Sequence, residues 1–191
     1  GNVGFHYGDS VRGIGDTNGD GAHELVTSSY RWLLDCESTP SDDHYTGMPG
    51  CGHQGGRFFL YNGQTGGLNT AHVMTARGDG SEDNFARSMI TDSDFNGDGH
   101  KDLLVGIPHD DDGGSDAGAL RVFAGSPIGI LSSEMVTIYG SSDGENLGLY
   151  TYRFGAGDLN GDGYDDLLVG IPTDDTTGTD SGKIIVYMGT S

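Results

Sequence analysis

The stretch Asp158–Pro172, "DLNGDGYDDLLVGIP", joins an acidic, glycine-bearing loop to a short apolar run. Nearly the same fifteen residues occur sixty-four positions earlier, at Asp94–Pro108, as "DFNGDGHKDLLVGIP". A third version, "DTNGDGAHELVTSSY" at Asp16–Tyr30, keeps the acidic loop but lacks the apolar ending. A unit that recurs at intervals of 78 and 64 residues indicates a repeat architecture.

Each unit is expected to contribute short β-strands in the same order around its acidic loop. The first strand precedes the loop and the second follows it, and the third and fourth come later in the unit. These segments are rich in β-branched and aromatic residues and are bounded by Gly, Asp and Ser, which is the pattern of strands and turns. First strands are expected at 7–14, 85–92 and 149–156, second strands at 24–29, 102–107 and 166–171, third strands at 56–63, 118–125 and 182–189, and fourth strands at 71–76 and 134–140.

Four antiparallel strands per repeat form the blade pattern of a β-propeller, so the sequence predicts an all-β fold of about three blades. Blade 1 is expected at about 5–80 with an insertion at 31–55, blade 2 at about 84–143, and blade 3 at about 148–191. The last blade is incomplete because no fourth strand follows "VYMGTS". Since propellers typically have roughly four to eight blades, we expect a partial propeller or half of an oligomeric ring.

Positions 1, 3, 5, 7 and 9 of each acidic loop are the candidate metal ligands. Calcium takes about six to eight oxygen ligands, and alternate residues of a tightly curled loop can direct such oxygens inward. Position 6 is always Gly, where the chain must turn sharply, while position 7 varies, as expected of a residue that binds through its backbone carbonyl. The sequence therefore predicts three Ca²⁺ sites, formed by Asp16, Asn18, Asp20, Ala22 and Glu24, by Asp94, Asn96, Asp98, His100 and Asp102, and by Asp158, Asn160, Asp162, Tyr164 and Asp166.

Other structures can contain loops of this kind. An EF-hand requires a bidentate Glu at position 12 and flanking helices, whereas position 12 here is Thr27, Val105 or Val169. A metal-free Asn-Gly or Asp-Gly hairpin turn is the remaining alternative. Three copies with carboxylates at positions 1, 5 and 9 favour a metal site, and calcium fits better than magnesium because magnesium keeps more of its waters.

The charge and the cysteines restrict the environment of the chain. Its 191 residues include 29 acidic and 9 basic side chains, a net charge of −20, so nucleic acid is a poor partner. We also expect no membrane insertion, because no run of eighteen apolar residues is present. Cys36 and Cys51 lie in a loop-like segment without a CxxC motif. We expect them to form a disulfide, which favours an extracellular, cell-surface or periplasmic location.

These motifs resemble the FG-GAP repeats of integrin α-subunit β-propellers and their bacterial relatives. The GAP element corresponds to Gly106-Ile107-Pro108 and Gly170-Ile171-Pro172, and the first unit has Ser28-Ser29-Tyr30 in its place. The resemblance implies calcium bound between the first two strands of each blade. It also implies a partial propeller, because members of that family usually have more blades than this chain supplies.

The FG element of the same family is matched more loosely. Its counterparts here are Tyr7-Gly8, Phe85-Ala86 and Leu149-Tyr150. With these elements included, the resemblance covers nearly the whole chain except the insertion from about 30 to 55.

The connections between strands fall on two faces of the expected blades. Connections 1–2 and 3–4 share one face, which carries the calcium loops. The insertion and the segments 77–83, 109–116 and 173–180 share the other face. In integrin-like propellers this second face is the ligand-facing side, so a ligand is expected there. Its candidate residues are Trp32, His44, His53, Arg77, Gly78 and Asp79.

Each of these candidates has a simpler explanation. Arg77-Gly78-Asp79 is the tripeptide that integrins recognise, but Gly and Asp are common enough here for it to arise by chance. His44 and His53 suit a transition metal or a solvated polar loop, and Trp32 suits a binding platform or packing beneath the insertion. The acidic runs at 110–112 and 174–175 suit further cations or charged loop tips that favour solubility.

The sequence contains no GxSxG, HExxH or Cys/His arrangement, and no catalytic residue is predicted. The predicted function is a non-enzymatic, secreted module in which calcium is structural and which recognises an extracellular protein or glycan, as in cell adhesion. One alternative is a structural domain that forms a homo-oligomer to complete a propeller. Another is an accessory domain of a secreted hydrolase or lyase.

Overall fold

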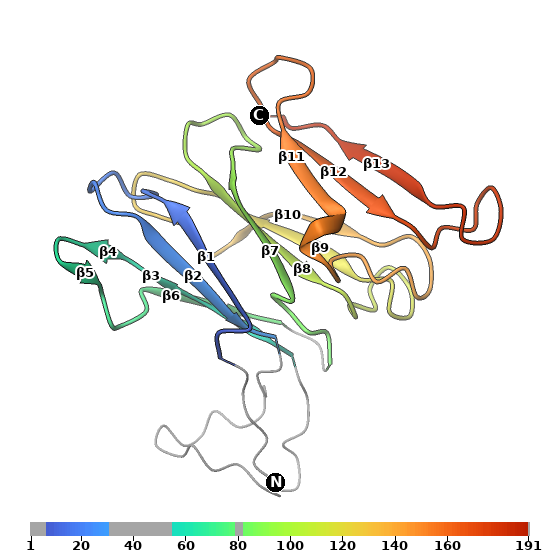
Figure 1. Cartoon of the computed structure of the whole chain (residues 1–191), viewed down its shortest axis with the longest axis horizontal. Helices are drawn as coiled ribbons and strands as arrows, with labels where there is room; N and C mark the ends of the chain where they lie inside the picture. Colours follow the sequence, from blue (N-terminus) through green and yellow to red (C-terminus); the bar gives the residue numbers. More distant parts are fainter. Residues whose placement is uncertain (1–6, 31–54, 79–81, 191) are drawn as a thin grey trace, which may run out of the picture.

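The computed structural model of the chain describes residues 7–30, 55–78 and 82–190, and they form three antiparallel β-sheets arranged one after another (Figure 1). Within this part of the chain there is one short 3-10 turn, Thr151–Arg153, and no helix that is long and apolar enough to cross a membrane. The all-β prediction is confirmed. The sheets form a partial propeller and do not close into a ring.

The first sheet has the strand order β1-β2-β3-β6, the second has β7-β8-β9-β10, and the third has β11-β12-β13. Every strand predicted from the sequence is present, and among the described residues the third sheet has no fourth strand, as expected. The bounds of the first sheet are β1 Ser10–Gly15, β2 Glu24–Ser29, β3 Arg57–Tyr61 and β6 Met74–Arg77. Those of the second are β7 Ser88–Ser93, β8 Asp102–Ile107, β9 Ala119–Phe123 and β10 Glu134–Tyr139, and those of the third are β11 Phe154–Gly157, β12 Asp166–Ile171 and β13 Lys183–Tyr187.

A small hairpin was not predicted from the sequence. It consists of β4 Gly63–Gln64 and β5 Gly67–Leu68, and it lies in the connection between β3 and β6. Strands of two residues give no alternating pattern that could be recognised in a sequence.

The central strands of the second sheet, β8 and β9, are buried on both faces because a sheet packs on each side of them. All residues of β8 and β9 are buried, which explains their nearly continuous apolar sequences. Alternate side chains point to opposite faces of a strand, so each strand contributes to two separate cores. The core between the first and second sheets includes Val26, Phe58, Met89 and Val105, and the core between the second and third includes Leu104, Leu120, Val169 and Ile171.

The FG element joins one sheet to the next. Phe85 is fully buried, stacks on Phe58 with a centroid distance of 5.9 Å, and meets Phe123 edge-on. Its backbone N–H donates to the carbonyl of Gly55 at 2.9 Å. A Cβ atom at Gly56 would lie 2.2 Å from the Phe85 carbonyl oxygen, so only glycine permits this close approach.

The third FG element lies two residues earlier than the sequence suggested. Leu147, rather than Leu149, repeats the contacts of Phe85: its N–H donates to the carbonyl of Ala117 at 2.9 Å, and it lies against Gly118. The expected pair Leu149-Tyr150 was wrong because β11 lacks the bulge residue of β7 while the third unit contains three additional residues before β11, which gives a net displacement of two. They form the 3-10 turn before β11 and displace the strand relative to the FG element.

We predict that Phe85→Ala lowers the free energy of unfolding by about 3–5 kcal/mol, because it leaves a cavity between two sheets. Urea unfolding followed by circular dichroism measures this loss. The matched control is Tyr152→Ala, since Tyr152 is 78% exposed, and its expected effect is within about 0.5 kcal/mol. Equal losses for the two variants would contradict the role given to Phe85.

Candidate metal centres

The acidic loops connect the first and second strand of each sheet and share one backbone conformation. Their glycines at positions 4 and 6 have positive φ angles, for example 74° and 87° at Gly19 and Gly21, and 78° and 92° at Gly161 and Gly163. Such angles are disfavoured for residues with a Cβ atom. The glycine at position 6 was expected from the need for a sharp turn, whereas the same requirement at position 4 was not predicted.

The carboxylate at position 1 is held at the centre of the loop by backbone N–H groups. Asp16 Oδ1 accepts from Gly19 at 2.7 Å and from Asp20 at 3.1 Å, and its Oδ2 accepts from Gly21 at 2.9 Å. The bond from Gly21, joined by those from Gly19 and Asp20, holds the pKa of Asp16 below its ordinary value. The loop backbone therefore favours the ionised carboxylate and fixes its position.

The other two loops repeat this arrangement. Asp158 accepts N–H groups from Gly161, Asp162 and Gly163 at 2.6–3.1 Å, and the bond from Gly163 contributes most to lowering its pKa. Asp94 accepts from Asp98 at 3.1 Å and from Gly99 at 2.8 Å.

Positions 3, 5 and 7 are linked in sequence by short local hydrogen bonds. The amide oxygen of Asn18 accepts from the N–H of Asp20 at 2.9 Å, and the carboxylate of Asp20 accepts from the N–H of Ala22 at 2.8 Å. The same bonds occur in the second loop at Asn96, Asp98 and His100, and in the third loop at Asn160, Asp162 and Tyr164. That the carbonyls at position 7 are metal ligands stays a prediction.

The carboxylate at position 9 is buried in the second and third loops and joins the loop to the end of the third strand. Asp166 is fully buried, and its two oxygens accept from Leu159 at 3.0 Å and from Gly189 at 2.9 Å. Asp102 accepts in the same way from Phe95 and Gly125, both at 2.8 Å. Burial raises the pKa of Asp102 in spite of these two bonds.

The first loop differs because Glu24 replaces Asp at position 9. Glu24 accepts from the N–H of Thr17 at 2.5 Å, as Asp102 and Asp166 do from position 2 of their loops, and it also accepts from the Thr17 hydroxyl at 2.8 Å. Oxygen atoms of Asp16, Asp20 and Glu24 all lie within 4.8 Å of one another. Among the residues that the structure describes, this is the one group of three such side chains close enough to hold a metal ion.

Adjacent acidic loops also contact each other, which the sequence analysis did not anticipate. The carboxylate of Asp165, at position 8 of the third loop, accepts from the N–H of Asp94 at 2.8 Å, and the N–H of Asp165 donates to the carbonyl of Asp94 at 2.9 Å. The ring of Tyr164 lies against Gly97, where a Cβ atom would be 2.6 Å from it. The second and third loops therefore form one continuous surface.

The acidic runs on the opposite face are involved in local structure. Asp110 is buried, with the guanidinium of Arg121 3.9 Å from its carboxylate, and Asp116 lies 2.7 Å from Nδ1 of His109. In the third sheet Lys183 forms an ion pair of 2.7 Å with Asp174.

Several ligand-face candidates cannot be placed. Trp32, His44, His53, Asp79 and the pair Cys36 and Cys51 lie outside the described residues, so the predictions about them stay predictions. Arg77 ends β6 with an exposed side chain, and the N–H of Gly78 donates to the carbonyl of Gly56 at 3.2 Å.

Comparison with known proteins gives matches along most of the chain. The family profile described as FG-GAP repeat matches residues 85–123 and 150–187. Integrin alpha-5 of Xenopus laevis is 31% identical over 142 residues, which is 71% of this chain and 13% of that protein. Integrin alpha-6 of Homo sapiens is 27% identical and integrin alpha-PS3 of Drosophila melanogaster 29% identical, over 76% and 74% of this chain. In each of these two cases the match covers 12% of the relative, so the chain spans about an eighth of the relatives' length.

We predict that Asp166→Asn lowers the free energy of unfolding by about 1–3 kcal/mol in buffer containing EDTA. The amide nitrogen cannot accept a hydrogen bond, so the N–H of Leu159 or of Gly189 loses its partner. The control is Asp162→Asn, which keeps an oxygen for the N–H of Tyr164, and urea unfolding of both variants gives the comparison. Equal losses of unfolding free energy in the two variants would contradict the stabilising role assigned to the buried carboxylate of Asp166.

The ion pair between Asp174 and Lys183 predicts a pH dependence of stability. Hydrogen bonds from Lys183 and Thr176 lower the pKa of Asp174 from 3.8 to about 2. A lowered pKa stabilises the fold above the unfolded value, and this stabilisation disappears as the pH falls from 3.8 to about 2. The difference in urea midpoint between the wild type and Asp174→Asn should therefore shrink across that range.

The control for this titration is the same substitution in a Lys183→Met background. There the ion pair is already absent, so Asp174→Asn should produce a much smaller change with pH. A pH-independent difference in the wild-type background would contradict the assigned cause.

Proposed function

Because the chain contains FG-GAP repeats and is similar to integrin α-subunits, we propose that it is an integrin-like propeller module with structural calcium in its acidic loops. Its opposite face would recognise a protein ligand outside the cell, and the module would have no catalytic role. The observation that carries the calcium proposal is the approach of Asp16, Asp20 and Glu24 to within 4.8 Å of one another.

The donor set fits calcium in chemistry and in charge. Calcium prefers carboxylate, amide and carbonyl oxygens, and each loop offers three carboxylates and one Asn side chain. The three N–H bonds to Asp16 leave about one of its roughly four lone-pair positions available to an ion. Three Ca²⁺ ions, each with two positive charges, would bring the net charge of −20 to −14.

The proposed ligands are those predicted from the sequence. In the first loop they are the side chains of Asp16, Asn18, Asp20 and Glu24, together with the carbonyl of Ala22. The corresponding positions would serve in the other two loops. The ion would offset the repulsion between carboxylates that are held within one loop, and it would thereby strengthen the link between the first and second strand of each sheet.

A protein ligand, a cell-surface or secreted location and a role in adhesion rest on the similarity to integrin α-subunits. The face opposite the acidic loops is the proposed binding side, and Arg77 and Gly78 lie on it. A glycan ligand depends on Trp32, which lies outside the described residues, so it stays a prediction. The disulfide between Cys36 and Cys51 would suit the same location.

The test of this proposal is unfolding in the presence and absence of calcium. Ligand at 100 times its dissociation constant should stabilise the fold by about 2.7 kcal/mol per site. The thermal midpoint should therefore rise clearly when EDTA is replaced by millimolar calcium, and by less with magnesium. Equilibrium dialysis should find about three calcium ions per chain. An unchanged midpoint, or no bound calcium, would refute the proposal.

Two variants that each remove one negative charge distinguish calcium binding at defined sites from a general reduction of the negative charge of the chain. Asp20→Asn removes a proposed ligand and should reduce the calcium-dependent shift. Asp180→Asn removes one negative charge from an exposed position in the segment 173–180, on the face opposite the acidic loops, and should leave the shift intact. Equal effects of the two substitutions would indicate general charge screening instead of defined sites.

A further inference from the structure

The second and third acidic loops are joined by a reciprocal pair of hydrogen bonds. The carboxylate of Asp165 accepts from the N–H of Asp94 at 2.8 Å, and the N–H of Asp165 donates to the carbonyl of Asp94 at 2.9 Å. Asp94 is position 1 of the second loop, and its carboxylate is a proposed ligand. Asp165 lies between Tyr164 and Asp166, the proposed ligands at positions 7 and 9 of the third loop. The two bonds therefore connect ligand residues of one loop directly to those of the next.

Two further contacts hold the same loops together. A Cβ atom at Gly97, position 4 of the second loop, would lie 2.6 Å from the ring of Tyr164. The N–H of Thr190, just beyond β13, donates to the carbonyl of Phe95 at 3.2 Å. The second loop is thus in contact with the third sheet from position 1 to position 4, and a change in the conformation of one loop has to be accommodated by the other.

In the described chain the first and second loops lack such a connection. Position 8 of the second loop is Lys101, whose side chain has no acceptor for the N–H of Asp16. A Cβ atom at Gly19 would meet no atom within 4 Å, whereas its counterpart Gly97 lies against Tyr164. The first loop therefore serves as an internal comparison for the other two.

We infer that calcium binds to the second and third loops with positive cooperativity, and that Asp165 is the positioning residue that couples them. An ion in the third loop would fix the carbonyl of Tyr164 and the carboxylate of Asp166, and would thereby restrict Asp165 between them. Asp165 in turn holds the backbone of Asp94, so the second loop loses less conformational freedom when its own ion binds. Because coupling between two sites is reciprocal, an ion in the second loop raises the affinity of the third by the same factor.

The inference rests on the proposed function, since it concerns how the calcium ions of two loops influence each other. Repulsion between two bound cations acts in the opposite direction. That repulsion weakens as salt is added, and at about 0.15 M the Debye length is about 8 Å. Coupling through the hydrogen bonds of Asp165 should therefore persist when the salt concentration is raised.

The test is a calcium titration of the full chain followed by NMR, because the glycine at position 6 reports on each loop separately. The N–H of Gly99 donates to the carboxylate of Asp94 at 2.8 Å, and that of Gly163 donates to the carboxylate of Asp158 at 3.0 Å. The chemical shift of each N–H should change when calcium binds to the carboxylate that it contacts.

Substitutions at position 5 remove one ligand from one loop at a time. Asp98→Asn, in the second loop, should raise the calcium dissociation constant reported by Gly163 about fivefold or more. Asp162→Asn, in the third loop, should raise the constant reported by Gly99 by the same factor. Asp20→Asn makes the same change in the first loop and should alter the constant reported by Gly163 by less than about twofold, which is below the usual range of coupling.

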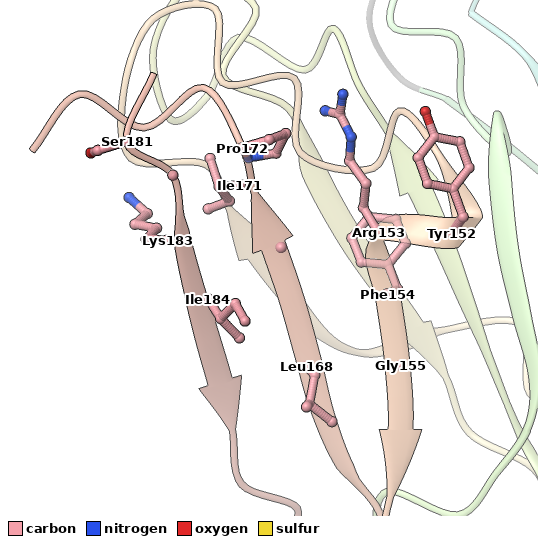
Figure 2. Close-up of a pocket in the computed structure, with 12 residues that line it drawn as sticks. Tyr152, Arg153, Phe154, Gly155, Leu168, Ile171, Pro172, Ser181, Lys183 and Ile184 are labelled. Carbon is pink, nitrogen blue, oxygen red and sulfur yellow. The ribbon is translucent and has the colours of Figure 1, made fainter. Parts of the chain in front are cut away.

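Variants of Asp165 test the connection itself. In an Asp165→Ala background, Asp98→Asn should no longer alter the dissociation constant reported by Gly163, because the hydrogen bond to Asp94 is lost. Asp165→Asn removes the charge but keeps an oxygen acceptor, so the coupling should remain. Tyr152→Ala is the control in the third sheet and should also keep the coupling. Tyr152 is 78% exposed, and Figure 2 shows it before β11, at the end of that strand away from the acidic loop.

Amide hydrogen exchange gives a readout that does not depend on binding constants. In Asp98→Asn, calcium in the third loop should slow the exchange of the Asp94 N–H, and Asp165→Ala should abolish this protection. Three bound ions with no coupling, or coupling that survives Asp165→Ala, would overturn the inference and leave the proposed function intact. Coupling lost equally in Asp165→Asn would overturn it as well, because charge would then be the cause. A chain that binds no calcium would overturn both.

Discussion

A buried carboxylate at the end of each acidic loop fixes the geometry on which the candidate metal centres depend. Asp102 and Asp166 each accept one N–H from the start of their loop and one from the second residue after the third strand of the sheet. One side chain thus ties together the loop, the second strand and the third strand. Burial opposes ionisation, as the raised pKa of Asp102 shows, so the two hydrogen bonds have to compensate for lost hydration.

The hydrogen bonds of the carboxylate at position 9 keep the loop closed. They hold the other acidic side chains close together, although the repulsion between these side chains favours an open loop. Glycines at positions 4 and 6 let the chain curl around the carboxylate at position 1, whose N–H bonds keep it ionised. Contacts between Asp165 and Asp94 then connect the second and third loops. A cation bound in such a loop would act on the packing between sheets as well as on a single turn, because the loops belong to the interface.

Much of the fold could be predicted from the sequence, because the repeats present each strand in the same context up to three times. The strands of the three large sheets follow from short apolar runs next to a recognisable loop, whereas the two-residue strands β4 and β5 do not. The third FG element was misplaced because the three residues of the 3-10 turn before β11 leave no compositional signal. The distinct geometry at Glu24 was missed because Asp and Glu are equivalent in a ligand pattern, although one methylene group changes which atoms the carboxylate reaches. The contact between Asp165 and Asp94 depends on how two sheets pack, which the local sequence does not encode.

The central claim is that each acidic loop holds one calcium ion among the oxygens at its alternate positions. A crystal structure of the chain grown in millimolar calcium, with anomalous data collected at a long wavelength, tests this directly. The account predicts an anomalous peak in all three loops, with that of the first loop lying among the carboxylates of Asp16, Asp20 and Glu24. Well-ordered loops that contain only water, with hydrogen bonds to Asp16, Asp94 and Asp158 unchanged, would contradict it.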